Sequence, residues 1–210
     1  MPIETVEIAG RFFEVELPDA ERMLQDAVAG EANGAAGWDP YWGLLWAAAP
    51  TTAELLIRAA PRWESSLELG CGVGLAGIAG LSTGRPVTFS DQSAAAVEMA
   101  VRNAARNGYE SVPGLVFSWD EPVEQHFDFL FGSDILYDKA GHGPLLQTMS
   151  AMLMRGGRVW IGDAGRSNAP LFVVRAQREG WKVRQFDSQL QPLRQPELLQ
   201  FRLLVLERGG

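Results

Sequence analysis

A glycine-rich segment and two carboxylates are the residues whose types and spacing could do chemistry. Residues 67–74 read Leu-Glu-Leu-Gly-Cys-Gly-Val-Gly, and Asp91 follows 21 residues after Gly70. Glycines let a ligand approach the backbone closely, and they allow backbone angles that are closed to other residues. A carboxylate about 20 residues after such a turn can accept the hydroxyl protons of a ribose. The pattern therefore predicts a nucleotide-type cofactor site on a turn between a strand and a helix.

Two classes of cofactor compete for this segment. Gly72, Gly74 and Gly77 match the literal dinucleotide fingerprint, but the match has little specificity in a chain with 23 glycines. Glu68 argues against a dinucleotide, because a buried acid just before the first glycine would crowd a pyrophosphate with like charge. The same acid suits a cofactor that carries an ammonium and a sulfonium, as S-adenosylmethionine does. We therefore expect S-adenosylmethionine, with an NAD-dependent oxidoreductase as the remote alternative.

Four further features resemble motifs of the class I, seven-stranded S-adenosylmethionine-dependent methyltransferases. Residues 133–137, Ser-Asp-Ile-Leu-Tyr, resemble the DxxY signature of the methyltransferase-16 group, which contains protein lysine methyltransferases and some protein N-terminal methyltransferases. Residues 39–46, Asp-Pro-Tyr-Trp-Gly-Leu-Leu-Trp, resemble the aromatic segment that precedes the fold in that group. Asp91 at the end of a predicted strand and the run Ser-Trp-Asp at 118–120 complete the resemblance.

The resemblance implies a role for each of these residues. The glycines would let the backbone contact the methionine part of the cofactor, and Glu68 would act on its ammonium or orient the turn. Asp91 would hold the ribose, and Trp119 would contact the adenine, although packing of Trp119 in the core remains an alternative. Trp46 would approach the cofactor. Packing of Trp42 and Trp46 in the core is an equal alternative to a role in the site. The expected cofactor contacts are Trp46, Glu68, Gly70, Cys71, Gly72, Gly74, Asp91, Gln92, Trp119, Ser133 and Asp134.

Asp134 and Tyr137 are the expected catalytic residues, because they follow an apolar run at the point where a nucleophile would meet the methyl group. Asp134 would attract an incoming ammonium and orient the amine, and Tyr137 would shape the pocket. In the alternative interpretation, Asp134 caps the following loop and Tyr137 is a surface aromatic.

The expected activity is methyl transfer to a lysine side chain of a protein. The alternatives are a small-molecule N-methyltransferase and a binding module without turnover. An open acidic groove at the pocket mouth would favour a protein substrate, and a closed lid formed by residues 18–50 would favour a metabolite.

Composition limits the other possibilities. Of the 210 residues, 47% are hydrophobic and 21% charged, which is typical of a globular protein. We expect one methyltransferase domain over residues 1–210, with 1–60 as an amino-terminal extension and lid and 61–210 as a Rossmann-like core. The amino terminus lacks the pattern of a signal peptide and no stretch has the length of a membrane span, so a cytoplasmic location is expected.

Charge and cysteine content bear on partners. A net charge of −8 disfavours nucleic acid and favours a basic partner, and no membrane partner is expected. We expect a monomer or weak dimer. One cysteine excludes an intrachain disulfide, and two distant histidines give no metal site. His126 and His142 are expected at the surface. Cys71 is interpreted as a small loop residue rather than a reactive thiol.

Alternating patterns predict an α/β fold with helices on both faces of a mostly parallel sheet. After an amino-terminal hairpin over residues 3–17, a helix from 18 to 28 and a loop at 30–37, a helix capped by Thr51 or Thr52 runs to about Ala60. Strands are then expected at 65–69, 86–90, 114–118, 127–133 and 158–163, and helices at 74–82, 93–107, 142–154 and 168–179. Two final strands, 181–186 and 198–207, have no helix between them. The resemblance implies the strand order 3-2-1-4-5-7-6, with the last strand antiparallel.

Four features predict the helix ends. Ser93 and Ser167 are expected as amino-terminal caps, and Gly108 and the pair Gly156-Gly157 as stop signals. Asn103 and Asn107 are expected to finish a helix.

Overall fold

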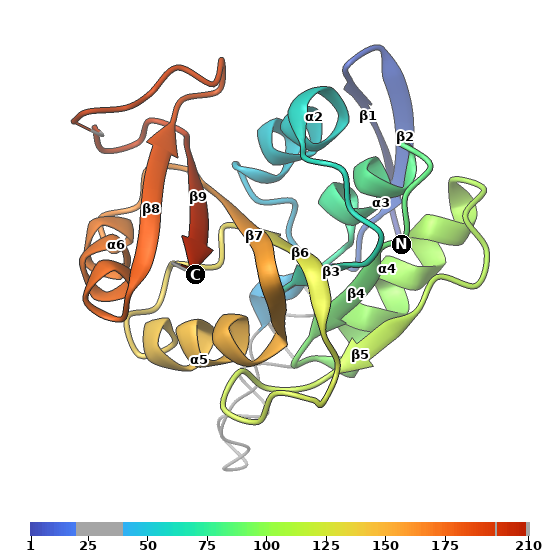
Figure 1. Ribbon diagram of the computed structural model, residues 1–210. Coiled ribbons are helices and arrows are strands. Elements are labelled where there is room, and N and C mark those ends of the chain that lie inside the picture. Colours follow the sequence, from blue (N-terminus) through green and yellow to red (C-terminus); the bar gives the residue numbers. More distant parts are fainter. Residues whose placement is uncertain (20–39, 196, 209–210) are drawn as a thin grey trace, which may run out of the picture.

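The computed structural model describes residues 1–19, 40–195 and 197–208 (Figure 1). Strands β1 (Ile3–Ile8) and β2 (Arg11–Glu16) form the expected antiparallel hairpin. The expected helix at 18–28 and loop at 30–37 lie outside the described residues, apart from residues 18 and 19. The assignment of residues 1–210 to one domain stays a prediction.

The remaining strands form one seven-stranded sheet in the order β5-β4-β3-β6-β7-β9-β8, so the predicted order is confirmed (Figure 1). Strand β9 runs antiparallel to both of its neighbours, while the pairs on the other side of β7 are parallel. The strands are β3 (Ser66–Leu69), β4 (Thr88–Asp91), β5 (Gly114–Val116), β6 (Phe127–Ser133), β7 (Leu153–Asp163), β8 (Trp181–Phe186) and β9 (Arg202–Arg208).

Two hydrophobic clusters cover the two faces of this sheet. Successive side chains of a strand point to opposite faces, so Phe129 and Phe131 of β6 join one cluster and Leu130 joins the other. The first cluster includes the hairpin, α2 (Ala49–Ala59), α3 (Leu75–Leu81) and α4 (Ala94–Arg106). The second includes α5 (His142–Met152) and α6 (Ala169–Arg178). A short 3-10 helix, η1 (Pro40–Gly43), precedes α2.

Some predicted helix boundaries are wrong. Helix α2 begins at Ala49, before both threonines, and the buried Thr52 hydroxyl instead donates to the Ala48 carbonyl oxygen at 2.7 Å. Its side chain packs on β7 at Gly162, where a Cβ would overlap the hydroxyl. Gly156 and Gly157 lie within β7, because the strand begins directly after α5 ends at Met152.

Of the other predicted helix ends, those of α4 are confirmed and the amino-terminal cap of α6 is wrong. Ser93 caps α4 by accepting the N–H of Ala96, and Gly108 adopts the left-handed conformation (φ 86°) just after the helix. Asn168, not Ser167, precedes α6, and it makes no side-chain cap bond.

His142 is buried rather than at the surface: its Nε2 lies 3.2 Å from the Leu136 carbonyl oxygen, and its ring meets Phe172 edge-on.

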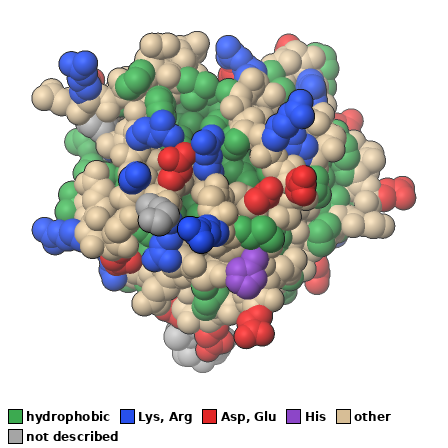
Figure 2. Space-filling view, viewed as in Figure 1, with side chains coloured by type: hydrophobic (Ala, Val, Ile, Leu, Met, Phe, Trp, Pro, Cys, Tyr) green, Lys and Arg blue, Asp and Glu red, His purple; other side chains and the backbone are tan. Residues whose placement is uncertain are grey.

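Basic residues accompany the strands at the β8 edge of the sheet. Arg158 and Arg184 both pair with Glu207, and Lys182 lies on the edge strand itself. Figure 2 shows Lys and Arg side chains spread over the face seen in Figure 1, with Asp and Glu side chains between them. Charged side chains on an edge strand oppose pairing with another chain.

None of the helices in the described part of the chain is long and apolar enough to cross a membrane.

Asn103 of α4 attaches the hairpin to the core. The side chain is buried; its Oδ1 accepts the N–H of Glu16 at 2.8 Å, and its Nδ2 donates to the carbonyl oxygens of Glu16 and Val73. Asn103 is therefore an interior residue of α4, whereas Asn107 ends the helix as expected. Asn107 holds the neighbouring backbone of Glu14 in the same way, but in an exposed position.

We expect Asn103→Ala to lower the free energy of unfolding by about 2–4 kcal/mol, because it leaves buried backbone groups of Glu16 and Val73 without partners. Asn107→Ala is the matched control and should cost about 1 kcal/mol or less, since water can replace its bonds. Urea unfolding of both variants measures the difference. Equal losses would contradict the structural role given to Asn103.

Candidate functional site

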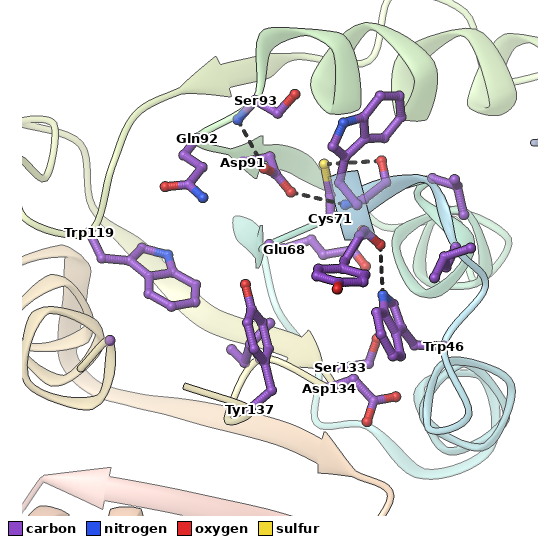
Figure 3. Close-up of a pocket in the computed structure, with 18 of the residues that line it drawn as sticks. Trp46, Glu68, Cys71, Asp91, Gln92, Ser93, Trp119, Ser133, Asp134 and Tyr137 are labelled. Atoms are coloured by element: carbon purple, nitrogen blue, oxygen red, sulfur yellow. Dashed lines mark hydrogen bonds between the residues drawn. The ribbon is translucent and has the colours of Figure 1, made fainter. Parts of the chain in front are cut away.

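A cavity of about 790 Å³ lies at the carboxyl edge of the sheet, where β3, β4 and β6 end (Figure 3). Trp46, Ser133 and Asp134 gather on one side of it in this view, and Gln92 and Trp119 lie on the other. The structure brings every predicted site residue except Gly74 to the lining: Trp46, Glu68, Gly70, Cys71, Gly72, Asp91, Gln92, Trp119, Ser133, Asp134 and Tyr137.

Glu68 organises the turn after β3 from within. Its carboxylate is buried, and Oε2 accepts the N–H of Gly77 in α3 at 3.0 Å. A Cβ at Gly77 would lie only 2.4 Å from that oxygen, so the glycine makes room for the acid. Burial raises the pKa of Glu68 well above its ordinary value; the Gly77 N–H opposes this rise, and nearby Asp91 adds to it. A cationic ligand beside Glu68 would favour its ionised form.

Gly72 and Gly74 of the turn have different structural roles. Gly72 has φ 51°, and a Cβ there would lie 2.8 Å from the Trp42 carbonyl oxygen, so both conformation and space require glycine. Gly74 lies outside the cavity lining, and its Cβ would meet Ala100 of α4 at 2.8 Å. It therefore serves the packing of α3 on α4. This packing role replaces the cavity contact expected for Gly74.

Asp91, the residue expected to hold a ribose, is hydrogen-bonded to the glycine turn. One oxygen accepts the N–H of Gly72 at 3.1 Å, and the other accepts the N–H of Ser93 at 3.0 Å. Each carboxylate oxygen has two lone-pair directions and can accept more than one hydrogen bond, and Asp91 lines the cavity. This geometry suits acceptance of ligand hydroxyl protons.

Trp119 packs partly on the second cluster and also lines the cavity, so its two interpretations coexist. Its backbone is fixed by Thr148 of α5, whose hydroxyl donates to the Trp119 carbonyl oxygen at 2.9 Å. An anchored indole beside Gln92 offers a flat surface to a planar ring (Figure 3).

Aromatic residues line the end of the cavity opposite Trp119. Trp46 Nε1 donates to the Tyr41 carbonyl oxygen at 2.9 Å, and the two rings lie 6.1 Å apart. Tyr137 and Tyr41 are about half exposed. Trp42 lies in η1 and Trp46 lies after it, so the two side chains do not share a helical face. Trp42 packs on the first cluster and also lines the cavity.

Asp134 does not present a free carboxylate to the cavity. Its side chain is 1% exposed, Oδ2 accepts the N–H of Ala48 at 2.6 Å, and Oδ1 pairs with Arg166 at 3.1 Å. The expectation that Asp134 directly receives an ammonium is thus revised, because its oxygens already hold the start of α2 and a guanidinium. The alternative that Asp134 caps the following loop does not describe these bonds either, because the carboxylate binds the backbone before α2 and the side chain of Arg166.

Sequence reasoning missed Arg166, which follows β7. Its Cζ lies 5.0 Å from the centre of the Trp46 ring. No local motif marks this residue. Only the adjacency of β6 and β7 in the sheet could have indicated that a residue after β7 meets Asp134.

Cys71 is buried in the turn, and burial, together with the charges of Asp91 and Glu68, raises the pKa of its thiol. This environment disfavours the thiolate and agrees with the interpretation of a small loop residue. Within residues 1–19, 40–195 and 197–208, no group of three His, Cys, Asp or Glu side chains could hold a metal ion.

Comparison with known proteins places this site in a family context. The family model described as lysine methyltransferase matches residues 41–171. The protein N-lysine methyltransferase METTL21A of Xenopus tropicalis is 35% identical over 90 residues. That similarity covers 40% of this chain and 42% of the relative, so the chain spans less than half of the length of this curated relative.

Solved structures share the fold. A TehB-like S-adenosylmethionine-dependent methyltransferase from Corynebacterium glutamicum aligns with 91% of this chain and all of its own, at a TM-score of 0.65 and 22% identity. The N-methyltransferase NodS from Bradyrhizobium japonicum, solved with S-adenosyl-L-homocysteine, aligns with 76% of this chain and 85% of its own, at a TM-score of 0.58 and 17% identity. At these identities the likeness concerns the fold.

A cationic cofactor bound beside Glu68 would stabilise the ionised carboxylate, so binding should lower the pKa of Glu68 and release a proton. Affinity should therefore rise with pH up to the pKa of the free protein, with a slope of at most about tenfold per pH unit. Glu68→Gln should flatten this dependence when the dissociation constant is measured by calorimetry over a series of pH values.

Equal pH dependence in the parent protein and in Glu68→Gln would contradict the assignment. Glu121→Gln is a matched control that removes an exposed acid from outside the cavity lining. It should leave the dependence as in the parent.

Proposed function

The chain belongs to the lysine methyltransferase family of S-adenosylmethionine-dependent enzymes, and from this premise we propose that it transfers a methyl group to a lysine side chain of a protein. The proposal gives the glycine-turn half of the cavity to S-adenosylmethionine and the aromatic end to the lysine amine. Methyl transfer leaves S-adenosylhomocysteine in the first half.

One observation carries the proposal: a single cavity is lined both by the glycine turn with Asp91 and by Tyr41, Trp46 and Tyr137. The first group suits the amino acid and ribose of the cofactor. In this proposal the aromatic residues flank the methylene stem of the lysine, and their ring faces attract a cation. Cofactor and amine would then meet near Ser133, at the end of β6.

The reaction is an in-line displacement. The amine nitrogen donates its lone pair to the methyl carbon as the carbon–sulfur bond breaks; the bonding electrons stay on sulfur, which becomes a neutral thioether. The methylated nitrogen then loses a proton to water. The attacking amine must be neutral, and for a lysine of ordinary pKa this costs about 4.6 kcal/mol at pH 7. Positioning and partial desolvation in the cavity must offset that cost.

The exposed rim favours a protein over a metabolite. Asp120 and Asp138 line the cavity from exposed positions, next to exposed Tyr137. Acidic groups at an open rim attract a lysine-bearing, basic segment. Most of the expected lid at 18–50 lies outside the described residues. The cytoplasmic location, the monomeric or weakly dimeric state and the lack of nucleic-acid and membrane partners stay predictions.

The proposed reaction predicts transfer of labelled methyl from S-adenosylmethionine to proteins of the host, with mass spectrometry placing the label on lysine side chains. Label only on small amines would support the small-molecule alternative. Binding of S-adenosylhomocysteine without any transfer would indicate a non-catalytic module. Thermal stabilisation by NAD and not by S-adenosylhomocysteine would overturn the proposal, because a ligand of the native state must raise the melting temperature.

Asp91→Ala should weaken S-adenosylhomocysteine binding by about 1–3 kcal/mol, because it removes hydrogen bonds from a charged acceptor to the ribose. Calorimetry measures the dissociation constant, and urea unfolding checks that the turn still folds. Glu121→Ala changes the net charge equally and should leave the constant unchanged. An unaltered constant in Asp91→Ala would remove Asp91 from the cofactor site.

A further inference from the structure

Arg166 connects three parts of the site. Its Nη2 lies 3.1 Å from Asp134 Oδ1, its Nε donates to the same oxygen at 3.1 Å, and its guanidinium lies over the face of Trp46. Its backbone N–H donates to Asp163 Oδ1 at 2.9 Å, which fixes the turn after β7. The side chain is 27% exposed, whereas that of Asp134 is 1% exposed.

Asp134 in turn determines the shape of the cavity wall. Its backbone N–H donates to the Gly162 carbonyl oxygen at 2.8 Å, and its Oδ2 accepts the N–H of Ala48. Ala48 directly precedes α2 and lies two residues after Trp46. The carboxylate therefore holds the end of β6, the start of α2 and the Trp46 segment together.

We propose that Arg166 is a positioning residue for methyl transfer, which holds Asp134 and Trp46 in the cavity wall and balances the Asp134 charge beside the entering amine. This inference rests on the function proposed above. Arg166 is not part of the cavity lining, so it acts through the two residues that are.

The charge balance matters because the nucleophile must be a neutral amine. An unbalanced carboxylate at Asp134 would stabilise the ammonium form and hold the lysine in its unreactive state. Other titratable groups face the amine position or stand behind it, and the variants below leave them unchanged. They are Tyr41 before α2, Glu68, Cys71 and Asp91 at the turn, Asp120 and Asp138 on the rim, Tyr137 after β6, and Asp163 and Arg202 behind Arg166.

The contact geometry requires arginine rather than any cation. A planar guanidinium can place its edge on a carboxylate while its face lies on an indole, whereas a lysine ammonium is a point charge without that face. Arg166→Lys should therefore keep the charge balance but loosen Trp46. This separates the electrostatic part of the role from the positional part.

The test compares pH profiles of kcat/KM for the parent, Arg166→Met, Asp134→Asn and the double variant, with the acceptor protein found by labelled-methyl transfer. Asn replaces Asp134 because the residue has φ 57°, a conformation that asparagine tolerates and alanine disfavours. Arg175→Met is the control: it also removes an arginine from an ion pair, with Glu179 just after α6, and Arg175 is outside the cavity lining.

We expect Arg166→Met to shift the acidic limb of the profile to higher pH by about half to one unit, because loss of a nearby positive charge raises the pKa of the amine. The double variant should return the limb close to that of the parent, because both charges are then gone. Arg166→Lys should keep the limb but lower kcat. Arg175→Met should match the parent.

A uniform loss of rate in Arg166→Met at every pH would overturn the inference, as would a double variant that keeps the shifted limb. S-adenosylhomocysteine binding by each variant, measured by calorimetry, should stay within about threefold of the parent, since the guanidinium is outside the cofactor half. If a single variant no longer binds S-adenosylhomocysteine, the pH profile of the double variant decides the test, because that variant leaves neither Asp134 nor Arg166 as an unpaired charge.

A second readout does not need an acceptor. The Arg166 Nε–H should give a slowly exchanging nuclear magnetic resonance signal, displaced by the Trp46 ring, that disappears in Arg166→Met and moves in Trp46→Leu and Asp134→Asn. A parent protein that transfers no methyl but shows this signal would reject the proposed function and leave the contact established. Absence of the signal in an active parent would reject the role of Arg166.

Discussion

Carboxylates held by backbone N–H groups govern the carboxyl edge of this sheet. Glu68 accepts the N–H of Gly77, Asp91 those of Gly72 and Ser93, Asp134 that of Ala48, and Asp163 those of Gly165 and Arg166. These acids lie at or next to the ends of the four adjacent strands β4, β3, β6 and β7. A buried carboxylate needs such donors, since an unpaired one would be costly, and each bond fixes the turn that supplies the donor.

This arrangement makes the site acidic as well as rigid. Three of the four acids line the cavity, and burial raises the pKa of Glu68 and of Asp163. Negative potential suits a cofactor with a sulfonium and an ammonium, and it would attract the lysine of the proposed substrate. The same potential disfavours the neutral amine that the reaction needs. In the proposed role, the guanidinium of Arg166 offsets the charge of Asp134 at the aromatic end of the cavity. At the glycine turn, a cationic cofactor would favour the ionised form of the buried Glu68.

Helix α2 joins the amino-terminal part of the chain to this chemistry. The N–H of Ala48 binds Asp134, and Thr52 packs where β7 has a glycine. The aromatic segment before α2 therefore cannot move without disturbing the end of β6. The hairpin is attached to the core through Asn103 of α4, and its strand β1 also contacts α2.

The sequence by itself determined the elements, the glycine turn and most of the residues around the cavity. Hydrophobic periodicity follows local geometry, and the turn, Asp91 and the segment after β6 are each recognised from a few neighbouring residues. The strand order came from family resemblance rather than periodicity. Tertiary structure alone decided that Asp134 pairs with Arg166, 32 residues later, that His142 is buried, and that Asn103 holds the hairpin. These contacts join residues that are distant in the chain, and only the packing of strands and helices brings them together. Local sequence carries no signal for them, because the partner of a buried polar group depends on which elements become neighbours in the folded chain.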